Sequence, residues 1–329
     1  MQLAKFLVKR LIQGIFVVWG VVTVLFVLRW LSPGDPVNLI AEQITDEDVR
    51  DAIRADLGLD QPVYIQYLDY LGNLAQGDLG ASYNEGRTVW NIITMHIGPT
   101  VELAVAATVI ALIISIPLGV VSATRRNQPA DYGATLGSLV GISTPNFWLG
   151  LMLILLLAER GGLFPTSGRS YSFVDGIYYL LTAGSPTELG IWMWHIILPA
   201  VTLGTYFTAL ITRLTRSGMI DELGKPYLTA TKAKGLPGVL VRYKHALRNT
   251  LIPIITVLGL QFGTLLGGAV ITEEVFNWPG LGRRFVNALR MGDWPIMQGI
   301  AIFIAVSFVI INIFVDAIYA KLDPRVIDE

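Results

Sequence analysis

Few residues in this sequence have the type and spacing that covalent chemistry requires. The chain of 329 residues contains no cysteine, and its three histidines, His96, His195 and His245, have no metal-ligand spacing. The single Gly-Lys pair, at 224–225, is followed by proline, where a phosphate-binding loop needs Ser or Thr. The apolar stretches contain no His-Glu-x-x-His motif, no paired aspartates and no Ser/His arrangement that an enzyme within the membrane would need. We therefore expect no catalytic residue, no metal site and no cofactor bound by this chain.

Non-covalent binding is the chemistry that the remaining polar residues suit. Seven of them recur in otherwise apolar stretches, which Gly and Pro interrupt at 116–119, 141–147 and 199–205. Polar groups at membrane depth must face protein or a water-filled cavity. Two interpretations stay open: kinks packed against neighbouring helices, or the lining of a solute pathway. The candidate lining residues are Ser143, Thr144, Asn146, Thr205, Thr208, Gln261 and Thr264.

The elements that carry these residues are long apolar segments. Hydrophobic residues make up 53% of the chain and charged residues only 15%. Because about 20 residues at 1.5 Å each cross the hydrocarbon core of a bilayer, six segments predict transmembrane helices. None of them contains an ionisable residue deep in the span. The expected fold class is an all-α polytopic membrane protein with helices over approximately 11–28, 100–122, 133–158, 195–214, 251–271 and 296–319.

Charge predicts the orientation of these helices. With both termini in the cytoplasm, fifteen of the 24 Lys and Arg residues, including every lysine, fall on the cytoplasmic side, as the positive-inside rule requires. The net charge of -1 argues against a nucleic-acid partner. We expect a multi-pass protein of the cell membrane, divided into an N-terminal tail with the first helix (1–32), an external cap (33–98), a core with five helices (99–320) and a cytoplasmic tail (321–329).

The cap is acidic and predicts two short helices. It holds eleven acidic residues against three arginines. Thr45 is placed to cap a helix with Glu47 and Asp48 in its first turn, and the glycine within 57–59 predicts its end. A second, amphipathic helix is expected over 63–74. Whether the cap only packs on the bundle or also binds a partner stays open.

A short basic helix is predicted over 227–234, in the connection 213–250 between the fourth and fifth spans. Pro226 suits its first turn, Lys232 and Lys234 suit the negative end of the helix dipole, and Gly235 suits a left-handed stop. So short a helix is unstable alone and needs a surface to pack on. The alternative is a basic loop that only sets the topology. The candidate coupling residues are Tyr227, Thr229, Ala230, Thr231, Lys232, Ala233, Lys234, Gly235 and Leu236.

Residues 231–236, followed by 245–253, resemble the cytoplasmic signature of permease subunits of ATP-binding-cassette (ABC) importers. Thr229, Ala230, Thr231 and Gly235 match the core of that motif, and Pro253 matches its later proline. Thr229 replaces the acidic residue of the general motif, and Gly235 lies farther from Pro253; both departures resemble the dipeptide/oligopeptide/nickel branch. Further stretches similar to that branch are PGDP at 33–36, GDLG at 77–80, STPNFW at 143–148, WPGLGR at 278–283 and DPR at 323–325.

This resemblance implies a type I ABC importer permease fold with an extracytoplasmic helical insertion between helices 1 and 2. It implies a heterodimer with a second homologous permease subunit and two cytoplasmic ATPases, which hold ATP and Mg and dock on the short helix. An extracytoplasmic binding protein would deliver the solute, which stays open among dipeptide, oligopeptide, glutathione, nickel chelate and sugar. Candidates for an outer gate or for contact with the binding protein are Phe276, Trp278, Arg283 and Arg284, whereas Trp294 suits an aromatic anchor at the membrane interface.

The alternative class is a secondary transporter or channel that works without ATPase partners. Such a protein usually keeps an ionisable residue deep in the membrane or shows an internal inverted repeat. The sequence shows neither feature, so energy is expected to enter through a partner subunit.

Overall fold

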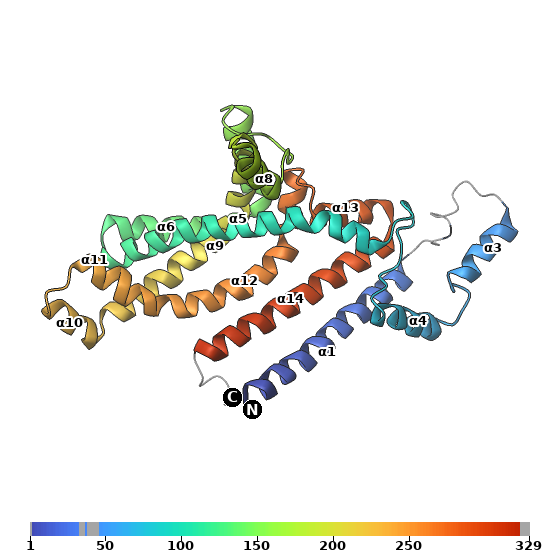
Figure 1. Cartoon of the computed structure of the whole chain (residues 1–329), viewed down its shortest axis with the longest axis horizontal. Helices are drawn as coiled ribbons and strands as arrows, with labels where there is room; N and C mark the ends of the chain where they lie inside the picture. The colour runs from blue at the N-terminus through green and yellow to red at the C-terminus, as the bar shows by residue number, and fades with distance from the viewer. Residues whose placement is uncertain (1, 33–36, 38–45, 323–329) are drawn as a thin grey trace.

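The computed structural model describes residues 2–32, 37 and 46–322; the side chains of 2–4, 232, 252, 260, 262, 264, 266, 268 and 318–322 are not described. This part of the chain is helical and contains no β-strand. Long helices lie side by side, with the cap helices at one end and α10 at the other (Figure 1). The helices are α1 (Gln2–Leu31), α3 (Glu47–Asp56), α4 (Val63–Ala75), α5 (Val89–Thr124), α6 (Pro129–Ser143), α7 (Asn146–Leu153), η1 (Ile154–Glu159, π-helical), α8 (Phe173–Ala183), α9 (Thr187–Leu223), α10 (Pro226–Ala233), α11 (Gly238–Leu240), η2 (Val241–Ala246, π-helical), α12 (Leu247–Val275), α13 (Leu281–Met291) and α14 (Trp294–Leu322).

The two longest helices, α5 and α9, form the core of the bundle. Glycines let their backbones approach closely: a Cβ added to Gly204 would lie 2.8 Å from the carbonyl oxygen of Ala107. A Cβ added to Gly119 would lie 2.5 Å from the Cβ of Thr215. Small residues at such contacts are typical of membrane helices, which associate by close packing because lipid gives no hydrophobic driving force between helices.

Replacing Gly204 with valine is expected to destabilise the folded chain, because the carbonyl of Ala107 belongs to the backbone and cannot rotate away as a side chain can. Overpacking of this kind costs about 1–3 kcal/mol, which corresponds to a fall of roughly 2–6 °C in the thermal unfolding midpoint of the detergent-solubilised protein. Gly190→Val is the matched control, since Gly190 lies on the same helix with nothing within 4 Å of an added Cβ. Equal midpoints for the two variants would contradict the close contact of α5 with α9.

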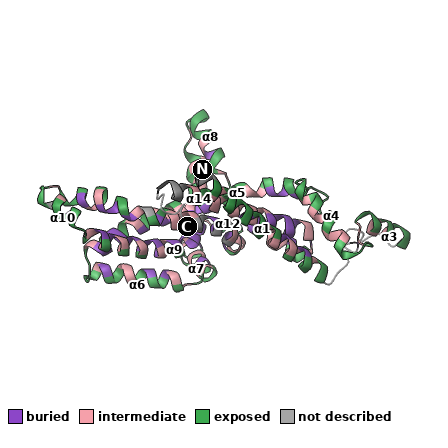
Figure 2. Ribbon diagram, turned by 90° about the horizontal axis from the view of Figure 1, so that it is seen from below, coloured by how far each residue is buried: buried purple, intermediate pink, exposed green. Residues whose placement is uncertain are grey.

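Three further long helices extend the bundle beyond this pair. α12 packs on α9 and α5, α14 packs on α12, and α1 packs on α14. The outward face of α1 carries large apolar side chains, and those of Ile12, Ile15 and Phe16 are more than 60% exposed. In Figure 2 the outer helices α3 and α6 are largely exposed or partly exposed, and buried residues concentrate in the helices between them. A continuous apolar exterior of this kind suits a lipid environment.

The predicted spans lie within helices, with one correction. Among the described residues, α1, α5, α9 and α14 are long and apolar enough to cross a membrane. The interruption predicted at 141–147 is a full break in the third span and not a kink, because α6 and the α7–η1 helix meet at 105° and form either one broken span or a re-entrant loop. Thr144 is extended at this break, as residues before proline prefer. The interruptions expected at Pro117 and Pro199 do not break α5 or α9. By length and composition the described residues give four or five spans against the six predicted, and the predicted fifth span lies in α12.

The cap contains both predicted helices, α3 and α4. α3 begins after Asp46, whose Oδ1 accepts a hydrogen bond from the N–H of Asp48 (3.1 Å). Thr45, the predicted cap residue, lies outside the described residues, as do the motifs at 33–36 and 323–325; Asp46 takes the capping role. α4 contacts α1, where the hydroxyls of Tyr67 and Thr23 lie 2.6 Å apart. The cap therefore packs on the first long helix.

Candidate functional site

A cavity of about 320 Å³ lies between α5, α6 and α9. Thr205 and Thr208, two of the predicted lining residues, line it from α9, and Thr212 continues the row. Glycines at every fourth position of α6, at 133, 137 and 141, line it from the opposite side, because residues four apart share a helix face. The structure thus brings two of the seven predicted polar residues to one cavity.

The threonine hydroxyls of this cavity are already bonded to their own helix. Each donates to the carbonyl four residues earlier, at 2.7 Å for Thr205, 2.9 Å for Thr208 and 2.6 Å for Thr212. A hydroxyl has one hydrogen to donate, so these groups offer a solute only their acceptor lone pairs. The lining is therefore mainly apolar, with weak polar contacts.

Of the other predicted lining residues, Ser143, Thr144, Asn146 and Gln261 lie outside this cavity. Ser143, Thr144 and Asn146 surround the break between α6 and α7, and Ser143 is exposed. Gln261 is partly buried on α12, where the side chain of Thr264 is not described. A pathway that includes all seven would have to pass along α6, α9 and α12, and this role stays a prediction.

The short helix predicted over 227–234 is present as α10, at the end of the bundle opposite the cap (Figure 1). It is followed by Gly235, whose φ of 78° is the expected left-handed stop. Leu228 anchors its inner face, fully buried against a cluster that includes Met219 and Val241. The remaining coupling candidates are partly buried (Thr231, Leu236), not described in their side chain (Lys232) or exposed (Tyr227, Thr229, Ala230, Ala233, Lys234).

Glu222, at the end of α9, is buried beneath α10 and holds it in place. Its Oε1 accepts hydrogen bonds from the hydroxyl of Tyr227 (2.5 Å) and the side-chain amide of Asn249 (2.8 Å). Its Oε2 lies 2.5 Å from Nζ of Lys225. Burial, and then the hydrogen bond to Glu222, raise the pKa of Tyr227 above its usual range. The tyrosine therefore keeps its proton and acts as a donor.

A second buried carboxylate closes the same end of the bundle. Asp131, in the first turn of α6, is only 2% exposed and accepts two hydrogen bonds from the guanidinium of Arg216 on α9, at 2.6 and 2.9 Å. The hydroxyl of Ser122 on α5 and the N–H of Asn127 complete its bonding, at 2.6 and 2.9 Å. One carboxylate therefore joins three helices, and every bond to it is charge-assisted.

At the opposite end, the aromatic residues predicted for an outer gate lie inside the chain. Trp278 is fully buried and its Nε1 donates to the carbonyl of Pro99 (2.8 Å). Phe276 is 1% exposed and packs with Ala158 and Leu198. In this arrangement neither side chain offers a surface to a binding protein, and a role in an outer gate stays a prediction.

The turn after α12 is organised by Glu273, which is fully buried. Its Oε1 accepts from the hydroxyl of Thr100 (2.7 Å), and its Oε2 accepts from the N–H of Arg283 (3.0 Å), in the first turn of α13. The Thr100 hydroxyl in turn accepts from the N–H of Leu281 (2.8 Å). A carboxylate at this place satisfies orphan N–H groups and complements the helix dipole, so Glu273 fixes the direction in which α13 leaves the turn.

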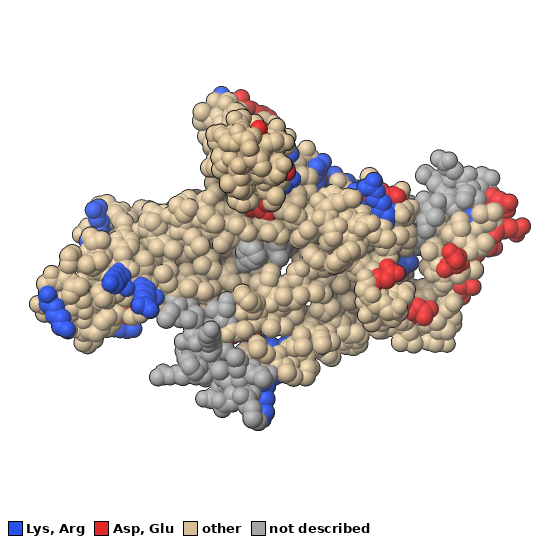
Figure 3. All heavy atoms as spheres, viewed as in Figure 1, with Lys and Arg blue, Asp and Glu red and all other residues tan. Residues whose placement is uncertain are grey.

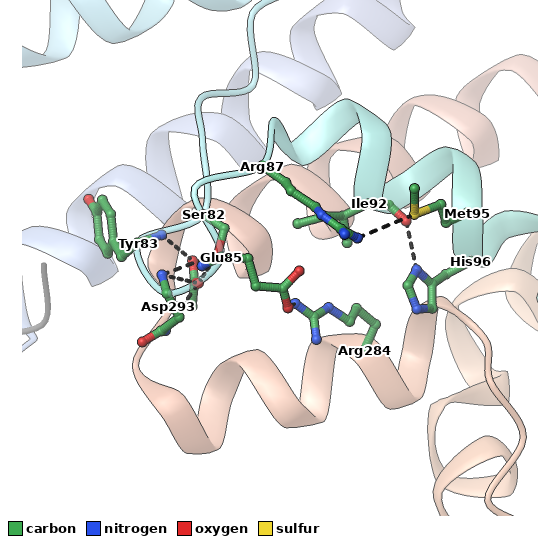
Figure 4. Close-up of polar contacts among 10 residues, drawn as sticks. Ser82, Tyr83, Glu85, Arg87, Ile92, Met95, His96, Arg284 and Asp293 are labelled. Carbon is green, nitrogen blue, oxygen red and sulfur yellow. Dashed lines mark hydrogen bonds and ion pairs between the residues drawn. The ribbon is translucent and has the colours of Figure 1, made fainter.

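A fourth cluster joins the cap to the corner between α13 and α14 (Figure 4). Asp293, which is 1% exposed, accepts from the hydroxyl of Ser82 (2.6 Å) and from the backbone and side-chain amides of Asn84 (3.3 and 3.2 Å). Arg284, one of the predicted contact residues, pairs with Glu85 of the same cap loop. The side chain of Arg283 is partly exposed. The loop that enters α5 is therefore fastened to the C-terminal part of the chain.

The sequence reasoning missed these buried carboxylates. Glu222 and Glu273 each stand in an acidic pair at a helix end, beside Asp221 and Glu274, which looks like an ordinary boundary in the sequence. Glu102, near the start of the predicted second span, accepts two hydrogen bonds from Arg169 (2.9 and 2.8 Å) and one from Trp192 (3.1 Å). No local pattern distinguishes the buried member of a pair from the exposed one, because the partners come from distant helices.

The two ends of the bundle differ in charge. Figure 3 shows Lys and Arg gathered at the α10 end, whereas Asp and Glu cover the α3–α4 end. Because salt screens charges over about 10 Å, the two groups act separately on whatever approaches each end.

The features described so far define a class: a polytopic membrane permease, built from long apolar helices around a cavity and closed at both ends by buried polar clusters. The chain belongs to the family of binding-protein-dependent transport system inner membrane components, whose model matches residues 115–328. A second model, for the N-terminal part of the membrane components of such systems, matches residues 3–104, which include α1 from its second residue and the whole cap.

Curated relatives match over almost their whole length. The chain is 38% identical to the oligopeptide transport system permease protein AppB of Bacillus subtilis, over 98% of this chain and 99% of the relative. It is 38% identical to the dipeptide transport system permease protein DppB of Escherichia coli K12, over 98% of each chain. It is 37% identical to the glutathione transport system permease protein GsiC of Escherichia coli O6:H1, over 98% of each chain. The protein is therefore a membrane permease subunit of an ABC importer.

Proposed function

We propose that the chain forms one half of the translocation pathway, with six transmembrane helices and both termini in the cytoplasm. α12 supplies the sixth span beside the four straight helices and the bent pair. The observation that carries the proposal is the placement of α10, which is exposed on its outer face, follows directly on α9 and leads through η2 into α12. A partner that binds α10 is thereby connected to two of the long helices, α9 and α12.

The partners proposed are two cytoplasmic ATPases that bind ATP and Mg, a second homologous permease subunit and an extracytoplasmic binding protein. The Lys and Arg residues at the α10 end support its cytoplasmic placement, and the acidic cap lies on the outer side, where the binding protein arrives. Closure of the ATPases shifts α10 together with α9 and α12. Since α9 lines the cavity, this movement opens the pathway alternately to each side.

The solute proposed is a peptide or a related small molecule. The relatives are named for oligopeptides, dipeptides and glutathione, which share peptide bonds. A lining of threonine acceptors and apolar groups, as around Thr205 and Thr208, gives weak contacts that do not depend on particular side chains of the solute. Such a lining favours release of the solute, because transport requires that the solute binds weakly enough to dissociate again.

Replacing Gly235 with leucine should uncouple ATP hydrolysis from uptake. A φ of 78° strains any L-residue by roughly 1–2 kcal/mol, and the side chain would project where the ATPase docks. Gly235→Ala adds the strain without the bulk and should retain more uptake. The measurement is dipeptide uptake per ATP hydrolysed by the complete importer in proteoliposomes.

Gly162→Leu is the control for this experiment, because Gly162 also has a positive φ (61°) and open space but lies in the connection after η1. Unchanged coupling in Gly235→Leu would contradict docking at α10. Uptake by the wild-type chain without any ATPase subunit would favour a secondary transporter or channel instead.

A further inference from the structure

The junction of α9, α10 and α12 is held by one carboxylate. Glu222 belongs to the last turn of α9, Tyr227 to α10, and Asn249 to the first turn of α12. Glu222 Oε1 accepts from both of these side chains, and the amide of Asn249 also lies 2.9 Å from the hydroxyl of Tyr227, so the three groups form a closed triangle. Each side of the triangle joins a different pair of helices.

Because Glu222 is buried, the triangle stabilises one arrangement of α9, α10 and α12. Glu222 is 5% exposed, so water does not replace a lost donor, and an unpaired carboxylate in such a place is strongly disfavoured. Lys225 reaches Oε2 from the turn between α9 and α10 and is itself half exposed, so it cannot hold α10 by itself. Swinging α10 away from α9 and α12 would remove the Tyr227 hydroxyl and leave the buried carboxylate with Lys225 and the Asn249 amide alone.

The two long helices are in close contact beside the triangle. A Cβ added to Gly218 of α9 would lie 2.7 Å from Cγ2 of Thr250, the neighbour of Asn249 on α12. Leu228 of α10 is fully buried in the same cluster as Met219. The ends of α9 and α12 and the inner face of α10 therefore form one packed unit, with Glu222 as its polar centre.

From this geometry we propose that Glu222 is the positioning residue that makes α10, α9 and α12 move as one rigid unit. The inference rests on the proposed function, because the coupled movement of the three helices has a role only if ATPases bind α10 and move it. Glu222 acts by fixing the angle of α10 against both long helices. Without it, α10 still binds an ATPase through its exposed face but passes less of the ATPase movement to the pathway.

The test compares variants in the complete importer, reconstituted with its ATPases and binding protein, by counting dipeptide molecules imported per ATP hydrolysed. Glu222→Leu should lower this ratio roughly tenfold, since a hydrogen bond to a buried charged group is worth about a factor of ten in the equilibrium that it controls. Glu222→Gln keeps an acceptor oxygen for Tyr227 and Asn249 and should restore most of the ratio. Tyr227→Phe removes one hydroxyl, leaves Leu228 packed, and should lower the ratio by a smaller factor.

Asp221→Leu is the matched control, because Asp221 has the same charge, lies one residue earlier on α9 and is exposed. A wild-type ratio in Glu222→Leu would overturn the inference. So would loss of the ATPase subunits from the purified Glu222→Leu complex, because Glu222 would then serve assembly only. Failure of the proposed function looks different: the wild-type chain would bind no ATPase, or would import without ATP, whatever residue stands at position 222.

Discussion

Arg216→Leu should lower the thermal unfolding midpoint of the purified chain more than any other single substitution at the α10 end. It would leave the carboxylate of Asp131, 2% exposed, without the guanidinium that now donates two hydrogen bonds to it. Breaking a buried ion pair by removing one partner costs about 3–5 kcal/mol. Because the Arg216 side chain is 30% exposed, we expect the lower part of that range and a fall of roughly 5–10 °C.

The control is Arg213→Leu, three residues earlier on α9, where the arginine is exposed. This substitution should change the midpoint by less than about 2 °C, as surface changes usually do. The double variant Asp131→Leu/Arg216→Leu should recover part of the loss, because replacing both members of a buried pair by apolar residues is often neutral. If the single and double variants unfold at the same temperature, the ion pair is not what holds α6 to α9.

Glu273→Leu should abolish uptake even if the chain still folds. Glu273 bonds the hydroxyl of Thr100 and the N–H of Arg283, and the loss of such a buried acceptor leaves each donor unpaired at about 1–3 kcal/mol. α13 would then leave the turn in a different direction, and Trp278, whose backbone N–H donates to the carbonyl of Glu273 (2.8 Å), would lose its position over Pro99. Dipeptide uptake and the unfolding midpoint, measured on the same preparation, check this expectation.

Glu274→Leu is the control at the adjacent position, since Glu274 pairs with Arg290 at the surface (2.6 Å) and exposed pairs contribute little. Glu273→Gln should also be impaired, because one amide NH₂ replaces an acceptor beside the Thr100 hydroxyl or the Arg283 N–H. Normal uptake in Glu273→Gln and Glu273→Leu would show that the turn after α12 tolerates another geometry.

Local signals explain what the sequence could predict. The helix over 227–234 was recognised because Pro226 and Gly235 mark its ends through backbone preferences that need no tertiary contact. The long helices follow from apolar runs, and α4 from its periodicity. The interruption of the third span at 141–147 was predicted, but the 105° angle at Thr144-Pro145 was not, because composition gives the length of a span and not its direction.

The polar architecture was beyond the sequence for a different reason. Asp131 and Arg216 are 85 residues apart in the sequence, and Asp293 and Ser82 are 211 residues apart. No local spacing therefore predicts either contact. The predicted pathway residues are polar residues within apolar runs, yet among those with described side chains only Thr205 and Thr208 share the cavity. Periodicity identifies the face of a helix, but it does not say which neighbouring helix that face meets.

The contacts of α1 set an order for biogenesis. Apart from the cap, its main neighbour is α14, which follows the other described helices in the chain: Gln298 Nε2 donates to the Leu25 carbonyl across 273 residues, and Arg10 pairs with Asp316 at 3.1 Å. The hydrogen bond between Ser82 and Asp293 likewise forms only after residue 293 has been synthesised. During translation α1 and the cap thus lack these contacts until α14 has been synthesised, and a chain truncated before α14 would leave α1 and the cap open to quality-control proteases.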